Sequence, residues 1–362
     1  MSSELDKIIA AVTKQHGSAV IVRGGKIEPC ERIPTGIFNF DLATGGGIPR
    51  GRLTEIYGPE SSGKTSVSLL LIAHVQKVLK QKAVFIDLEN SLDFEWAARL
   101  GVDIEDLIVL YPDSAEQAVD FVEAFLHVDE VGIVVLDSLA AMTPQNEIDS
   151  SADKQIVGGS SALAGKMMRK VGVVLKSEMK RDHKPAFLVL NQIRHKIGVM
   201  FGDPETTPGG NSPRFAYNLR IRLYAKDKMV ESVSKDFATF RTVSGIIKKW
   251  KVPIVARNFE YDFCLIPHDN VGLGQSPSWN TVASKLKEHG LLAKTDKGWI
   301  CQGVEFKTIA QLQALYNSDE ALQRALQKDV VDAVSKKMLA PTGANDEPQG
   351  FVDMTTGEII EE

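Results

Sequence analysis

The stretch Gly58-Pro59-Glu60-Ser61-Ser62-Gly63-Lys64-Thr65 decides the fold. Its spacing is Gly-x-x-x-x-Gly-Lys-Thr, and the apolar residues 53–57 and 66–79 around it predict a strand before it and a helix after it. In such a loop the glycines let backbone N–H groups converge on phosphate oxygens, Lys64 reaches the terminal phosphates, and the Thr65 hydroxyl can bind Mg²⁺. The stretch therefore predicts a nucleoside triphosphate site at a strand-to-helix junction.

Two other apolar stretches end in acids. Residues 83–89 end in Glu89, and residues 131–138 end in Asp137 and Ser138. Because the carboxyl ends of parallel strands meet at one edge of a sheet, both acids are expected beside the phosphate-binding loop. There Asp137 can hold the Mg²⁺ shell, and Glu89 can orient or deprotonate a water that attacks the γ-phosphate. The alternative for each acid alone is a cap on the next helix.

The segments around these strands alternate between helix and strand patterns. Helices are expected at 93–100, 115–127 and 162–181, and strands at 107–111 and 185–190. Strands that are apolar on both faces predict a parallel sheet covered by helices on both sides. The expected fold class is therefore α/β with a mostly parallel central sheet.

Composition indicates an ordinary globular chain. Its 362 residues are 43% apolar and 25% charged, and no apolar run approaches the roughly 18 residues of a spanning helix. The three cysteines are far apart and odd in number, so neither a disulfide framework nor a zinc site is implied. We expect a cytoplasmic protein without a membrane partner.

Charge is distributed unevenly along the chain. The net charge of −5 argues at first against a nucleic-acid partner. After Pro341, however, the chain carries six acids and no Lys or Arg, which exceeds the whole net charge. Residues 163–196, in contrast, hold nine Lys or Arg and two acids. Basic charge is therefore concentrated near the middle of the chain.

Residues 193–211 form a long segment in which cations, apolar side chains and glycines alternate. Such a loop is too long and too rich in glycine for a simple connection. The mixture suits a segment that grips phosphates while it stacks against bases, and an ordinary surface loop is the equal alternative. The polar residues 145–161 also predict a mobile loop.

The two ends of the chain have patterns of their own. Residues 3–15 predict a short helix with an apolar stripe, which docks either on its own core or on another subunit. The chain alone favours its own core. Residues 270–338 predict a small helical unit. The acidic tail is expected to be disordered, and it either competes with DNA for basic surface or acts as a solubilising end.

Four stretches form a set of motifs. They are Glu55 to Thr65 (Glu-Ile-Tyr-Gly-Pro-Glu-Ser-Ser-Gly-Lys-Thr), Phe85 to Glu89 (Phe-Ile-Asp-x-Glu), Asp137 to Pro144, and Asn191 to Gly202, the last continued by Pro204 to Asn211. This set resembles the motifs of the bacterial RecA recombinases. The resemblance covers about residues 3 to 335 and is densest from 33 to 268. Departures from the pattern, described below, indicate a divergent or phage-borne member.

The resemblance implies a domain plan. Residues 1–32 would be an oligomerisation arm of one helix and one strand, and residues 33–268 a RecA-like P-loop NTPase core. Residues 269–338 would be a small α/β domain, and residues 339–362 the disordered acidic tail. The core would carry two DNA-binding loops, at about 145–165 and 193–211.

The resemblance also implies an ATP site shared between neighbouring subunits. Glu89 would activate water, and Gln192 would sense the γ-phosphate and transmit its presence to the following loop. Thr65 and Asp137 would hold Mg²⁺. The nucleotide-binding residues would be Gly58, Pro59, Glu60, Ser61, Ser62, Gly63, Lys64, Thr65, Ser66, Asp93, Trp96, Asp137 and Ser138.

Two positions depart from the family pattern. Trp96 stands where the family has a tyrosine that stacks on adenine, and its broad face keeps the ability to stack. The family uses two lysines, spaced by one residue, that reach the neighbour's γ-phosphate. Here Lys248, Lys249 and Lys251 all lie in that region, so the pair is Lys248 with either Lys249 or Lys251.

The resemblance assigns DNA and subunit contacts as well. The DNA-binding residues would be Lys166, Arg169, Arg194, Lys196, Ile197, Met200, Phe201, Gly209, Gly210 and Asn211. Ile8, Ile9 and Val12 of the first helix, together with Phe215, would contact the neighbouring subunit. For that helix the resemblance overrides the preference for its own core.

The function implied is that of a DNA-dependent ATPase. It would form helical filaments on single-stranded DNA and pair them with homologous duplex DNA. A filament-forming scaffold or regulator without strand exchange is an alternative, although such a protein needs no water-activating Glu89. A hexameric helicase with the same core is another, although helicases lack the Asn-Gln-Ile-Arg loop at Asn191.

Overall fold

The computed structural model describes residues 4–16, 30–151, 158–195, 205–234, 237–267 and 271–339, and the short pieces 351–352 and 359–360. Its centre is an eight-stranded sheet of order β12-β11-β10-β3-β7-β6-β4-β5. The strands from β10 to β5 run parallel, and β11 and β12 continue the sheet in antiparallel fashion. The predicted α/β fold with a mostly parallel sheet is confirmed.

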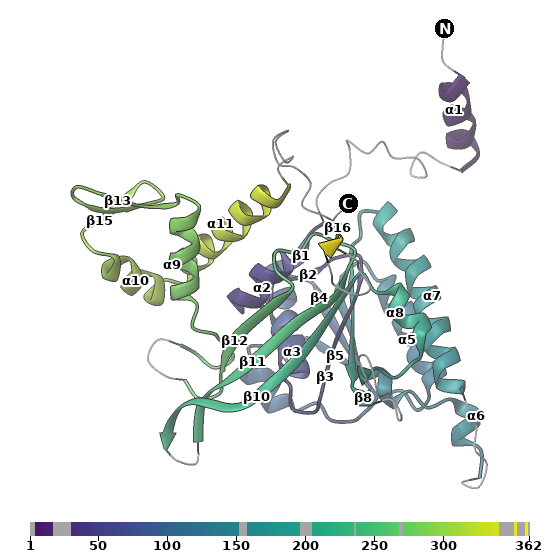
Figure 1. Cartoon of the computed structure of the whole chain (residues 1–362). Helices are drawn as coiled ribbons and strands as arrows, with labels where there is room; N and C mark the ends of the chain where they lie inside the picture. Colours follow the sequence, from purple (N-terminus) through teal and green to yellow (C-terminus); the bar gives the residue numbers. More distant parts are fainter. Residues whose placement is uncertain are drawn as a thin grey trace.

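The sheet strands have the following bounds: β3 Leu53–Gly58, β4 Lys82–Asp87, β5 Leu107–Leu110, β6 Val131–Asp137, β7 Ala186–Gln192, β10 Leu219–Ser234, β11 Phe237–Trp250 and β12 Asn258–Cys264. Strands β3 and β6 are buried along their whole length, as their continuous apolar patterns predict. Beyond the covered part of the sheet, β10 and β11 extend as a long hairpin (Figure 1).

Helices cover the two faces of the sheet (Figure 1). On one face lie α3 (Lys64–His74), which continues as a π-helical turn (Val75–Leu79), and α4 (Phe94–Arg99). On the other face lie α5 (Ala115–Leu126) and α7 (Gly159–Lys180). Each face has its own apolar core, with α3 and α4 side chains in one and α5 and α7 side chains in the other. The sheet is thereby held rigid between two packed layers, which fixes the positions of its strand ends.

The loop predicted over residues 145–161 is partly wrong. Residues Gln145–Ile148 form the short helix α6, and α7 begins at Gly159, earlier than predicted. The Gln145 N–H donates to Glu116 on α5 at 2.9 Å, so a tertiary contact supports the start of α6. Gly158, with φ of +88°, sets the turn before α7, a conformation that glycine adopts without strain. Residues 152–157 lie outside the described part of the chain.

The first helix, α1 (Glu4–His16), begins and ends within one residue of its predicted bounds and lies apart from the sheet (Figure 1). Its stripe residues Leu5 and Ile8 are 64% and 57% exposed. Docking of this stripe on the chain's own core, which the sequence alone favoured, is therefore wrong. Downstream, β1 (Arg32–Ile33) pairs with β2 (Ile48–Pro49), and α2 (Phe38–Thr44) lies between them in the chain.

The carboxyl-terminal unit contains helices and a small sheet, so the α/β unit implied by the resemblance is confirmed, and the purely helical unit expected from residues 270–338 is wrong. It consists of α9 (Trp279–Glu288), α10 (Ile309–Ser318), α11 (Glu320–Leu339), and a three-stranded sheet of β13 (Leu292–Thr295), β14 (Gly298–Cys301) and β15 (Val304–Phe306). Its core also takes in Phe38 and Leu42 of α2. In the tail, β16 (Phe351–Val352) pairs with β17 (Ile359–Ile360). No helix in the described ranges combines the length and apolar character needed to cross a membrane.

Candidate functional site

The loop Gly58–Thr65 connects the end of β3 to the start of α3. Gly58 has to be a glycine, since a Cβ there would lie 2.2 Å from the Leu223 carbonyl oxygen of the adjacent strand β10. Gly63 has a φ of +89° and is the residue before α3, so the first-turn N–H groups of the helix face the loop. The Lys64 Nζ donates to the carbonyl oxygens of Gly58 and Pro59, at 3.1 and 2.7 Å. The predicted residues thus form an anion-binding loop that its own lysine covers.

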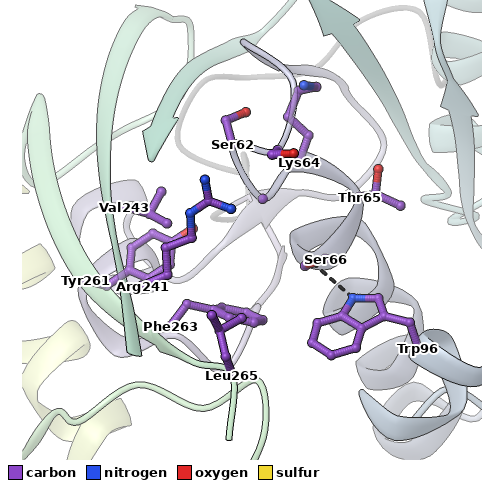
Figure 2. Close-up of a pocket in the computed structure, with 12 residues that line it drawn as sticks. Ser62, Lys64, Thr65, Ser66, Trp96, Arg241, Val243, Tyr261, Phe263 and Leu265 are labelled. Atoms are coloured by element: carbon purple, nitrogen blue, oxygen red, sulfur yellow. Dashed lines mark hydrogen bonds between the residues drawn. The ribbon is translucent and has the colours of Figure 1, made fainter. Parts of the chain in front are cut away.

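Beside the loop lies a pocket of about 290 Å³ (Figure 2). Residues 61–66 form one side of it and Trp96 of α4 another. The Trp96 indole N–H donates to the Ser66 hydroxyl at 3.2 Å, which fixes the ring at the pocket edge. Asp93, the residue before α4, accepts a hydrogen bond from the Trp96 N–H at 2.9 Å. An aromatic ring next to an anion-binding loop suits a ligand with a flat base and phosphates.

Strand pairing brings the predicted acids and Gln192 to the same edge. Gly58 lies opposite Gln192 in the β3–β7 pair, and Asp137 lies opposite Asp87 in the β6–β4 pair. Glu89, just after β4, accepts hydrogen bonds from the Ser138 hydroxyl and, at 3.1 Å, from the Gln192 side-chain amide. The carboxylate is therefore held between the ends of two strands.

Thr65 and Asp137 form the second part of this edge. The Thr65 hydroxyl donates to the Asp137 carboxylate at 3.0 Å. Burial raises the pKa of Asp137 to about 6, and the hydrogen bond from Thr65 opposes this rise. A hydroxyl and a carboxylate side by side, next to a phosphate-binding loop, are the hard oxygen ligands that Mg²⁺ prefers. The residues present therefore fit a magnesium ion.

Asp87, which the sequence analysis did not assign, shapes the turn that carries Glu89. Its carboxylate accepts hydrogen bonds from the backbone N–H groups of Glu89, Ser91 and Leu92, at 3.1, 2.9 and 3.0 Å. Asp87 therefore stabilises the turn after β4 and does not cap the next helix, α4, whose N-cap is Asp93. In the sequence, an acid at the end of the apolar stretch, two residues before Glu89, could have indicated this role.

A buried network lies directly behind Gln192. The Glu55 carboxylate of β3 accepts hydrogen bonds from Asn191 of β7, at 2.9 Å, and from Arg220 of β10. Asn191 also donates to the Pro208 carbonyl at 3.3 Å, and Arg220 to the Thr207 hydroxyl at 3.3 Å. The network therefore joins three strands to the far end of the segment 193–211.

The predicted DNA-binding residues are only partly described. Arg194 of β8 (Arg194–His195), which pairs with β9 (Glu205–Thr206), lines a second pocket of about 310 Å³ with Ser160, Ser161, Gly209 and Gly210. Gly209, with φ of +92°, lies close to Leu139, where a Cβ would be 3.0 Å from the Leu139 side chain. Lys166 and Arg169 are exposed on α7. Asn211 begins α8 (Asn211–Ala216), and Lys196, Ile197, Met200 and Phe201 lie outside the described residues.

A cationic surface lies at the end of β11, the strand that pairs with β10 on the side away from β3. Phe215 of α8 is 75% exposed, and the Lys249 and Lys251 ammonium groups both donate to its carbonyl oxygen at 2.9 Å. Burial and the neighbouring Lys251 lower the pKa of Lys249 to about 8. Lys248 precedes Lys249 in β11 and lies at an irregularity of the strand, where Ile247 pairs with Ile221 and Lys249 with Arg220. The structure therefore brings Lys249 and Lys251 together, with the one-residue spacing.

Comparison with known proteins agrees with this geometry. The model of the RecA N-terminal domain matches residues 3–264. The chain belongs to the RecA family. Protein RecA of Symbiobacterium thermophilum is 44% identical over 263 residues, which cover 71% of this chain and 72% of that protein. Protein RecA of Heliobacterium modesticaldum is 41% identical over 254 residues (69% and 71%), and that of Streptomyces ambofaciens is 36% identical over 302 residues (83% and 77%).

The RecA family motifs account for one half of the pocket only. The other half comes from Arg241 and Val243 of β11, Tyr261 and Phe263 of β12, and Leu265 just after β12. These residues lie far along the chain from the phosphate-binding loop and belong to no motif that we recognised. In the sequence they stand at every second position, which predicts that they share one face of the sheet. This spacing does not predict that the face lines a pocket.

Proposed function

We propose that this RecA-family protein is an ATP-dependent DNA recombinase, which forms filaments on single-stranded DNA and pairs them with homologous duplex DNA. The observation that carries the proposal is the position of Glu89, whose carboxylate accepts hydrogen bonds from Ser138 and Gln192. A water-activating carboxylate is thereby tied to the residue that leads directly into segment 193–211. Such a contact can couple ATP hydrolysis to DNA binding.

The side chains at the strand ends have distinct parts in hydrolysis. Lys64 exchanges its contacts with the loop carbonyls for the terminal phosphates, and Thr65 and Asp137 hold Mg²⁺, which neutralises charge on the phosphate oxygens when bound. Glu89 orients and deprotonates the attacking water, and Gln192 reports the γ-phosphate. Trp96 stacks on the base, beside Asp93.

Completion of the site requires a neighbouring subunit. In this proposal Lys249 and Lys251, rather than Lys248, reach the γ-phosphate of the neighbour, because these two ammonium groups converge beside the exposed Phe215. A cation supplied across an interface makes hydrolysis depend on assembly. The apolar stripe of α1, with the exposed Ile8 and the half-buried Ile9 and Val12, docks on the same neighbour. DNA as the partner implies a cytoplasmic setting.

The test is ATP hydrolysis with and without single-stranded DNA. We expect DNA to accelerate turnover strongly and Lys64→Ala to abolish it; turnover that ignores DNA would contradict the proposal. Strand exchange with homologous and heterologous duplexes separates a recombinase from a scaffold, since equal yields favour the scaffold. Closed rings in electron micrographs, in place of open helical filaments, favour a helicase.

A further inference from the structure

The wall of the pocket that faces the phosphate-binding loop comes from the antiparallel part of the sheet. In the β11–β12 pair, Arg241 lies opposite Phe263, and Val243 lies opposite Tyr261. Because side chains alternate along a strand, these four point to one face, and all of them line the pocket. β11 runs antiparallel to β10, so its early residues lie at the edge where β3 ends in the loop. Figure 2 shows the Arg241 guanidinium between the aromatic wall and Ser62.

Polar groups in this wall lack protein partners. Tyr261 is 3% exposed, and its hydroxyl forms no hydrogen bond within the described residues. Burial raises its pKa, which keeps it a neutral phenol that can donate a hydrogen bond. The buried Ser62 hydroxyl of the loop also has no hydrogen-bond partner among the described residues. Buried polar groups without partners are unfavourable unless a ligand or water satisfies them.

Arg241 differs from the arginines of the adjacent strand. Arg220 and Arg222 of β10 each donate to a carboxylate, Glu55 and Glu205 respectively. Among the described side chains, none forms a hydrogen bond or an ion pair with the Arg241 guanidinium. A guanidinium presents a planar pair of donors that matches two oxygens of a phosphate group.

We propose that Arg241 and Tyr261 bind the α- and β-phosphates of the nucleotide within the same subunit, from the wall opposite the loop. The assignment rests on the proposed nucleotide site. Within that site, Glu89 and Gln192 mark the γ-phosphate end and Trp96 marks the base end. Arg241 lies between the loop and the aromatic wall (Figure 2), the place that this proposal gives to the phosphates nearer the base. The pair therefore contacts groups that ATP and ADP share.

Titration calorimetry with ADP and with a non-hydrolysable ATP analogue tests this assignment. We expect Arg241→Gln to weaken both ligands equally, by at least about tenfold, and Tyr261→Phe to weaken both by about threefold. Arg257→Gln is the matched control, since Arg257 is exposed just before β12 and does not line the pocket. It should bind as the unaltered protein does. Arg241→Lys, which keeps the charge but not the planar donor pair, should give an intermediate affinity.

Thermal unfolding without nucleotide separates ligand contact from a structural role. We expect Arg241→Gln to unfold at the temperature of the unaltered protein, because it loses no described hydrogen bond. Tyr261→Phe should unfold at that temperature or a higher one, because it removes a buried hydroxyl that has no partner among the described residues. Unchanged nucleotide affinity in both variants would overturn the proposal, and so would weakening of the ATP analogue alone, which would assign Arg241 to the γ-phosphate. If Arg241→Gln does not fold, Tyr261→Phe decides by the same criteria.

These outcomes are distinct from failure of the proposed function. If the unaltered protein binds neither nucleotide, the nucleotide site itself is wrong. If it binds both and Lys64→Ala loses the ATP analogue, while Arg241→Gln and Tyr261→Phe both bind normally, only the role of Arg241 and Tyr261 is wrong.

Discussion

The two halves of the central sheet build the pocket in different ways. In the parallel half, β3, β4, β6 and β7 all end at one edge, and each delivers its functional residue at or just after the end of the strand. In the antiparallel half, β11 and β12 deliver theirs from within the strands, by register alone. Residues at strand ends are recognisable in a sequence, whereas residues that share a site through register are not.

The largest effect should come from the parallel half. Glu89→Gln removes the carboxylate that orients water and keeps a similar shape, so we expect the rate of ATP hydrolysis to fall by about 10²- to 10⁴-fold. Nucleotide affinity should be nearly unchanged, as measured by calorimetry. Gln192→Ala is the informative partner, because it removes the contact to Glu89 and should uncouple hydrolysis from DNA. Retained hydrolysis in Glu89→Gln would break the assignment of the strand-end acids.

A second prediction tests Lys249 and Lys251, the lysines at the end of β11 in the antiparallel half. Lys249→Met and Lys251→Met should each lower DNA-stimulated hydrolysis by about 10²-fold, the cost of losing one group that stabilises transition-state charge. Lys248→Met is the control and should change the rate by less than about threefold, because the two ammonium groups that the structure brings to the Phe215 carbonyl oxygen are those of Lys249 and Lys251. The largest loss in Lys248→Met would show that the pair is wrong.

A third prediction concerns the rigidity of the parallel half. Leu188 of β7 is fully buried in the core next to α3, so Leu188→Ala should lower the free energy of unfolding by about 2–5 kcal/mol. Leu315→Ala, at an exposed position on α10, should change it by less than about 1 kcal/mol. Denaturant unfolding followed by circular dichroism measures both. Equal losses would show that the core is not where the structure has it.

The smallest effect is a pH dependence centred on Asp137. Its pKa is about 6 in the folded chain against an ordinary value of 3.8, so the folded state binds the proton more tightly. Stability is therefore lost as pH rises from about 4 to about 6, by on the order of 2 kcal/mol. Asp137→Asn should flatten this part of the profile of unfolding temperature against pH. Asp41, whose pKa burial raises to about 7, remains in that variant and accounts for any residual slope.

The difference between the halves also explains what the sequence could predict. Gly58 to Thr65, Glu89 and Asp137 were predictable because one apolar pattern and one strand end locate each of them. Trp96 follows from the family resemblance. Arg241 and Tyr261 were not predictable from the sequence. Their positions depend on the register of β11, which shifts at a bulge between Ala225 and Met229 of β10. The helix α6 was missed because its start depends on a hydrogen bond to Glu116, which lies 29 residues earlier in the chain, on α5.

The Lys249 side chain has a thermodynamic consequence for assembly. With a pKa of about 8, it is only partly charged in mildly alkaline solution when the subunit is alone. A phosphate group supplied by a neighbour stabilises the charged form, so joining two subunits should draw a fraction of a proton from the buffer. Calorimetry of assembly in buffers of different ionisation enthalpy should detect this uptake, and Lys249→Met should abolish it. Polymer growth would then respond to a modest change in acidity.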